Sequence, residues 1–159
     1  MKDYSVFYKE IRNQFKYYKK EIYYFNVGLT LLYYVLYPLL LILSFHKDYF
    51  MKLLLFPAIS FVLLTVIRQF INRARPYEKW DIRPLIKKNT KGNSMPSRHI
   101  FSATMISMCY LMVVPVLGSI LLAISAVCAF IRVIAGLHYP SDVIVGYLVG
   151  VVVGIFMIL

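Results

Sequence analysis

Residues 22–45 read IYYFNVGLTLLYYVLYPLLLILSF, a run that contains no charged side chain. A helix needs about 20 apolar residues to cross about 30 Å of hydrocarbon, so this run is long enough to span a membrane. The whole 159-residue chain is 60% hydrophobic, whereas soluble domains contain about 45–50% apolar residues. A soluble fold of this size cannot hide so much apolar surface, and the stretch therefore predicts a membrane-spanning helix.

Further apolar runs follow at residues 50–72, 99–114, 117–136 and 141–159. Residues 73–98 are polar and basic and rich in Pro, Asn and Lys, which is typical of a loop. The sequence thus predicts an all-α integral membrane protein, built as a bundle of about five transmembrane helices.

Residues 1–21 are rich in Lys and Arg, and their aromatic and aliphatic residues recur at spacings of three and four. This pattern predicts an amphipathic helix with one aromatic and one basic face, lying on the membrane surface. A solvated basic tail is the alternative. We divide the chain accordingly into an interfacial helix at 1–21 and a transmembrane domain at 22–159.

The chain has a net charge of +11, from 18 Lys and Arg against 7 Asp and Glu. Such an excess favours an anionic partner, and the hydrophobicity favours a membrane surface or an anionic substrate over nucleic acid. Cys109 and Cys128 lie in apolar runs without a CxxC partner. We therefore interpret both as small hydrophobic residues and expect neither a disulfide nor a metal site.

Gly146, Gly150 and Gly154 form a GxxxGxxxG stripe on one face of the last apolar run. Small residues let helices approach each other closely in lipid. We expect the stripe to pack inside the bundle, and homodimerisation through it is the weaker alternative.

Charged residues inside spans are costly and usually mark a functional site, and three polar segments stand out here. The first is RQFINRARP at residues 68–76, where Arg68 and Arg75 are two helical turns apart. A helix that runs this far would bring both onto one face, with Arg73 pointing elsewhere. Flanking charge at the end of a span is the alternative interpretation.

The second segment is SMPSRH at residues 94–99, where a helix is expected to begin. The free N–H groups of a helix start bind phosphate well. Ser97 would cap the helix or donate to a phosphate oxygen, Arg98 adds positive charge, and His99 titrates near neutral pH. A simple cap with an incidental histidine is the alternative.

The third segment is RVIAGLHYPSD at residues 132–142, which holds the only charged residues between 99 and 159, Arg132 and Asp142. Pro140 interrupts the helix, so His138 and Asp142 would meet through a turn. A carboxylate that holds one imidazole nitrogen leaves the other free as a nucleophile or base. A buried structural pair is the alternative.

Two histidines, one aspartate and several arginines are thus expected to converge where the polar loop meets the spans. Guanidinium groups match the oxygens of phosphate. The sequence has no cluster with metal-ligand spacing and no glycine-rich nucleotide loop, so we expect neither a metal nor a cofactor. The chemistry indicated is metal-free attack on a phosphate by a histidine.

The three segments resemble, in order, the signature of the type 2 phosphatidic acid phosphatase superfamily, the lipid phosphate phosphatases, which is K-x6-RP, PSGH and SR-x5-H-x3-D. Here the segments read R-x6-RP with Arg68 and Arg75, then PSRH at residues 96–99, then Arg132, His138 and Asp142 at the same spacing. The resemblance covers roughly residues 60–159.

The resemblance implies that His138 is a nucleophile that forms a phosphohistidine, that Asp142 orients it, and that His99 protonates the leaving oxygen. Arg68, Arg75, Ser97 and Arg132 match the positions that hold the phosphate. Family members hydrolyse phosphate or pyrophosphate esters on lipids without a metal ion. The expected partners are therefore membrane lipids and a lipid phosphate, such as phosphatidylglycerophosphate, phosphatidic acid or undecaprenyl pyrophosphate.

Three positions depart from the family pattern. Arg68 replaces a lysine and changes the geometry of the charge. Arg98 replaces a glycine, so its side chain would contact a second, pyrophosphate-like group or point to solvent. Ile131 replaces a serine, which removes one polar contact. Larger members also have six spans, whereas five are expected here.

A non-catalytic transporter or binder of anionic lipids is the alternative function, since it would use the arginines and have no need of His138. We expect the protein to lie in a bacterial cell membrane. The positive-inside rule would make the side with the active site cytoplasmic. Superfamily members commonly work on the outer face, so the sequence leaves the side open.

Overall fold

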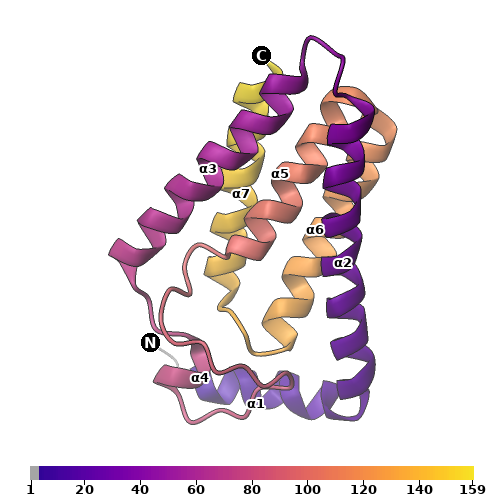
Figure 1. Ribbon diagram of the computed structural model, residues 1–159. Helices are drawn as coiled ribbons and strands as arrows, with labels where there is room; N and C mark the ends of the chain where they lie inside the picture. Colours follow the sequence, from indigo (N-terminus) through magenta and orange to yellow (C-terminus); the bar gives the residue numbers. More distant parts are fainter. Residues whose placement is uncertain (1–3) are drawn as a thin grey trace.

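The computed structural model describes residues 4–159, which form helices joined by turns and one long loop, with no strand in that range (Figure 1). The helices are α1 (Tyr4–Phe15), the 3-10 turn η1 (Lys16–Tyr18), α2 (Lys19–Leu43), α3 (Phe50–Ile71), α4 (Pro76–Lys79), α5 (Arg98–Val113), α6 (Pro115–Ile134) and α7 (Pro140–Ile158). The all-α prediction is confirmed, and each of the five apolar runs forms one of the helices α2, α3, α5, α6 and α7.

Helix α5 lies at the centre of the bundle, where it packs against α6 and α7 on one side and α2 and α3 on the other (Figure 1). Most of its residues between Ile100 and Tyr110 are buried. With 16 residues it is shorter than the roughly 20 that a full crossing needs. The four longer helices are long and apolar enough to span a membrane, and they enclose α5 as a core helix.

The glycine stripe of α7 faces α5. A Cβ atom at Gly146 would lie 2.7 Å from the carbonyl oxygen of Ser97, and one at Gly150 would lie 2.8 Å from Cβ of Thr104. Gly154 packs equally closely against the side chain of Met108. The stripe therefore brings two helices of the same bundle into contact, and a homodimer would have to use another surface.

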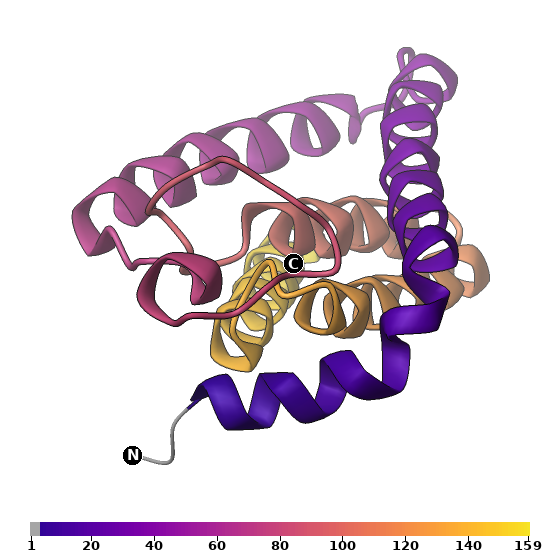
Figure 2. The same ribbon diagram turned by 90° about the horizontal axis from the view of Figure 1, so that it is seen from below.

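Helix α1 crosses the lower end of the bundle almost at right angles to the spans (Figures 1 and 2). Its Tyr8 is fully buried. The Tyr8 hydroxyl donates to the carbonyl of Ile134 at 3.1 Å and accepts from the backbone N–H of Leu85 at 3.2 Å. The aromatic face of α1 is thus fastened to the bundle, which does not fit a free solvated tail. Residues 1–3 of the expected interfacial helix lie outside the described residues.

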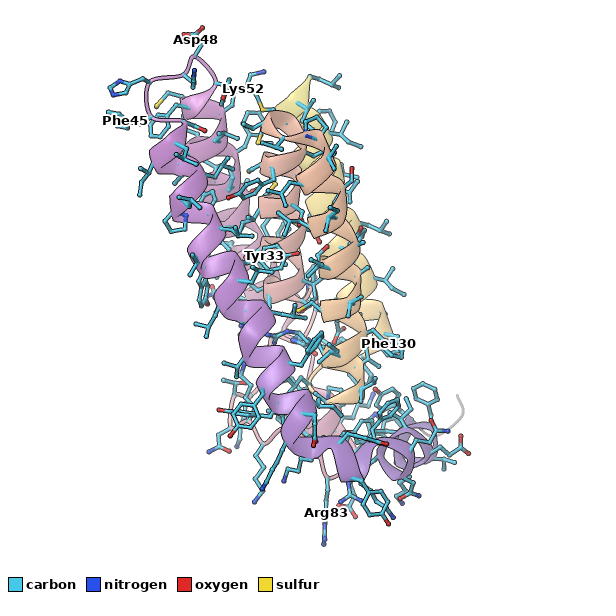
Figure 3. The ribbon with its side chains drawn as sticks, turned by 90° about the vertical axis from the view of Figure 1, so that its right-hand side faces the viewer. Tyr33, Phe45, Asp48, Lys52, Arg83 and Phe130 are labelled. Atoms are coloured by element: carbon cyan, nitrogen blue, oxygen red, sulfur yellow. The ribbon has the colours of Figure 1, made fainter. Side chains whose placement is uncertain are left out.

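Charged side chains mark the two ends of the bundle. Asp48 and Lys52 lie at the end that carries the α2–α3 connection, and Arg83 lies at the opposite end, beside α1 (Figure 3). The long apolar surface between them includes exposed residues such as Phe130. This is the distribution of a protein whose middle faces lipid.

Candidate active site

The polar segments meet at the end of the bundle that α1 crosses, where the α4–α5 loop (residues 80–97) covers the α6–α7 turn (residues 135–139) (Figure 2). A backbone hydrogen bond of 3.1 Å from Leu85 to Ala135 joins the two. The candidate residues lie at helix ends here: Arg68 in the last turn of α3, Arg75 just before α4, Ser97 before α5, Arg98 and His99 in its first turn, Arg132 in the last turn of α6, His138 in the α6–α7 turn and Asp142 in the first turn of α7.

Asp142 is fully buried and accepts hydrogen bonds from three other residues of this region. One carboxylate oxygen accepts a hydrogen bond from Arg73 at 2.7 Å. The other accepts from the hydroxyl of Ser94 and, at 3.0 Å, from the backbone N–H of Tyr139. The same oxygen lies 3.6 Å from Nδ1 of His138, and Ser94 Oγ lies 3.3 Å from that nitrogen. Ser94 therefore stands between the imidazole and the carboxylate.

Arg73 and Ser94 are two members of this network that the sequence interpretation did not identify. Arg73, which was expected to point elsewhere, also donates to Ser141 at 2.8 Å, and its guanidinium lies 4.2 Å from the ring centre of Tyr139. No motif position corresponds to Ser94. Its position in SMPSRH, two residues before Pro96 of the quoted signature, was the only available signal.

Arg68 and Arg75 reach the site by a route that differs from the expected one. Asn72, with a φ of 38°, ends α3 in the left-handed region, so the prediction of one continuous helix face was wrong. Both side chains are buried. Arg68 donates to the loop carbonyl of Asn93, and Arg75 donates to the loop carbonyl of Gly92 at 3.2 Å and to the carbonyl of Leu137 in the α6–α7 turn at 3.4 Å. The loop thus holds the two guanidinium groups beside the α6–α7 turn.

Ser97 and Arg132 carry polar atoms that the protein leaves unsatisfied. Ser97 is 0% exposed and Arg132 is 2% exposed, and neither Ser97 Oγ nor Arg132 Nε has a hydrogen-bond partner within residues 4–159. Ser97 precedes α5 without a side-chain cap bond, so its hydroxyl remains available. Because buried donors without partners are costly, this pair indicates a binding site for an anion.

Arg132 and His99 line a cavity of about 170 Å³, which we call the arginine cavity, together with Arg98. Arg98 is exposed, and its guanidinium lies 5.3 Å from the ring centre of Phe61. The arginine cavity shares five lining residues with an apolar groove of about 410 Å³: Tyr33, Tyr34, Phe61, Ser102 and Ile106. The groove runs between α2, α3 and α5, so a cationic pocket opens directly into an apolar channel.

Burial lowers the pKa of the His138 imidazole below its ordinary value, the Asp142 carboxylate opposes this shift, and nearby Arg75 lowers the pKa further. His138 is therefore neutral at neutral pH and keeps a lone pair on one ring nitrogen. No group of three or more His, Cys, Asp or Glu residues suited to a metal ion occurs in the described part of the chain.

A family model for the PAP2 superfamily matches residues 49–159. The crystal structure of Aquifex aeolicus LpxE is similar to this chain, with a TM-score of 0.69 and 26% identity over 96% of this chain and 92% of that one. The fold also matches the first transmembrane PAP2 type phosphatidylglycerolphosphate phosphatase from Bacillus subtilis, with a TM-score of 0.60 and 21% identity over 96% and 90% of the two chains. A comparison with curated protein sequences finds no significant match.

Proposed function

We propose that this chain, which belongs to the PAP2 superfamily, is a membrane phosphatase that hydrolyses a lipid phosphate or diphosphate through a phosphohistidine, without a metal ion. Phosphatidylglycerophosphate, phosphatidic acid and undecaprenyl pyrophosphate represent the substrate class. The two solved structures named above come from Aquifex aeolicus and Bacillus subtilis, and we assign this protein to a bacterial cell membrane.

In the proposed reaction Nε2 of His138 attacks the phosphorus atom while the bond from phosphorus to the lipid oxygen breaks. His99 takes up a proton together with the anionic substrate and gives it to that oxygen, and the lipid alcohol, or the shortened lipid phosphate, leaves. Neutral His99 then removes a proton from water, which attacks the phosphohistidine. The P–N bond breaks and inorganic phosphate is released, with both histidines restored.

The environment of His138 supports its role as nucleophile. Ser94 and Asp142 lie on the Nδ1 side of the ring, so we infer that Nδ1 carries the proton and that Nε2 presents the lone pair. Asp142 is itself fixed by Arg73 and by the backbone of Tyr139. The orientation of the ring is thus set before the substrate arrives, which favours in-line attack.

The continuity between the arginine cavity and the apolar groove is the observation that carries the proposal of a lipid substrate. Arg132 with its unsatisfied Nε suits a phosphate oxygen, whereas the groove is lined almost entirely by apolar and aromatic surface from α2, α3 and α5. A molecule with a phosphate at one end and a hydrocarbon chain at the other matches both parts. The groove faces the membrane, so such a molecule enters without leaving the lipid.

The first test is phosphate release by the purified protein from a panel of lipid phosphates in excess chelator. We expect release to continue, because the residues in the proposed steps transfer protons and the phosphoryl group without a metal ligand. Vanadate should inhibit competitively. Binding of the lipids without release would identify a transporter or binder, and activity restored only by a divalent ion would overturn the metal-free mechanism.

A second test blocks the apolar groove. Ala58 is exposed and lines the groove, so Ala58→Trp fills it without touching a charged residue. We expect KM for a long-chain lipid phosphate to rise about tenfold or more, since burial of each CH₂ contributes about 0.8 kcal/mol. Hydrolysis of a short-chain soluble phosphate should change little. Ala123→Trp, at an exposed position on α6 outside the groove, is the matched control; an equal loss in both variants contradicts the assignment.

A further inference from the structure

A second cavity meets the site from the side of the loop. This loop cavity, of about 290 Å³, is bounded by the first half of α2, by residues 86–88 of the α4–α5 loop and by Leu137 of the α6–α7 turn. It shares Thr30, His99 and Arg132 with the arginine cavity. His99 and Arg132 are therefore reached from two directions, through the apolar groove and through the loop cavity.

The loop adds two cations to this second cavity, Lys87 and Lys88. Lys87 is exposed, whereas Lys88 is the more buried of the two. Lys88 is half-buried, and none of the ion pairs within residues 4–159 involves it. The carboxylate nearest to the site, Asp142, already accepts hydrogen bonds from Arg73, Ser94 and Tyr139. Among residues 4–159, the positive charge of Lys88 is thus left without an acidic partner.

Burial, followed by the positive charges of Arg132 and Arg75, lowers the pKa of Lys88 from its ordinary value to about 8. Arg98 and Arg68 lower it further. All four arginines that the sequence places around the phosphate thus act on this one ammonium group. No carboxylate is among the causes of this shift, so an anion at the centre of the cluster would favour the charged form of Lys88.

We propose that Lys88 is a further phosphate-binding residue, which contacts substrate oxygens beside His99 from the loop cavity. This inference rests on the proposed function. Lys88 must be protonated to bind phosphate, and bound phosphate in turn raises the pKa of Lys88. Phosphate binding should therefore weaken as the pH rises above about 8, because a proton must then be taken up with the anion.

The test is the affinity for inorganic phosphate, measured by titration calorimetry on the full-length protein in detergent at pH 8 and pH 9.5. We expect Lys88→Ala to weaken binding at pH 8 about tenfold. Lys88→Arg should bind normally at pH 8 and lose little affinity at pH 9.5, whereas wild type loses about tenfold, since arginine does not deprotonate. Lys91→Ala removes a charge from an exposed position of the same loop and should match wild type.

Turnover of a lipid phosphate separates the two hypotheses. If wild type releases phosphate from the lipid but Lys88→Ala and Lys91→Ala bind inorganic phosphate equally, the role of Lys88 is refuted and the phosphatase assignment stands. A parallel loss of affinity with pH in wild type and Lys88→Arg refutes it as well. If wild type releases no phosphate from any lipid, the proposed function itself fails.

Discussion

Replacing His138 by alanine should abolish turnover, with a loss of about 10⁶-fold, the size seen when a catalytic nucleophile is removed. No other side chain in the described network is expected to accept the phosphoryl group, because His99 serves as the acid in the proposed reaction and Ser94 is engaged with Asp142. The first measurement is phosphate release from a lipid phosphate. The second is the amount of phosphate that stays bound to the protein after rapid quenching in acid and in base. A phosphohistidine is labile to acid and survives base.

The chain contains a matched control for this experiment. His46, the third histidine, is exposed in the α2–α3 connection at the opposite end of the bundle. His46→Ala should retain full activity and the labelled intermediate. Asp142→Asn should fall between the two, because the imidazole remains but loses the charge that orients it. Retained turnover in His138→Ala, or labelling of that variant, would show that another residue is the nucleophile.

Replacing His99 by alanine should slow lipid phosphate hydrolysis by about 10²–10⁴-fold, the usual contribution of a general acid. The loss should depend on the leaving group, since an activated aryl oxygen needs little protonation as it departs. We therefore expect an aryl phosphate to restore the burst of aryl alcohol release in single-turnover experiments. The later hydrolysis of the phosphohistidine stays slow, so the intermediate should accumulate.

The aryl substrate separates the two histidines. It should rescue the first step in His99→Ala and leave His138→Ala inactive, because a better leaving group cannot replace a nucleophile. Rescue of His138→Ala alone would show that the two histidines have the opposite roles. Equal rescue of both variants would leave neither role supported.

The spans and the signature residues were accessible from the sequence because they depend on local composition and spacing. The apolar run 22–45 corresponds to α2, Lys19–Leu43, within three residues at each end. The segment with His138 and Asp142 forms a turn followed by a helix start, as Pro140 indicated. Interactions between distant segments were not accessible. Arg73 meets Asp142 across 69 positions, and no periodicity encodes such a pair.

Arg75 lies beside the α6–α7 turn, as expected, but it reaches this place by another route than the sequence suggested. Helical spacing from Arg68 suggested a shared face, but the left-handed conformation of Asn72 ends the helix first. The loop carbonyl of Gly92 then positions Arg75. Lys88 was missed for the same reason: its role depends on where the loop folds back, which a basic and irregular stretch does not specify.

The two hydrogen bonds of the Tyr8 hydroxyl, to Ile134 and Leu85, bear on how deep in the bilayer the active site lies. An amphipathic helix such as α1 settles at the level of the lipid headgroups. Since Tyr8 ties that helix to the end of α6 and to the loop, we expect His138 to lie at the same level as the phosphates of the surrounding lipids. The enzyme therefore has no need to lift its substrate out of the membrane: the lipid diffuses sideways, and its phosphate arrives at the right height.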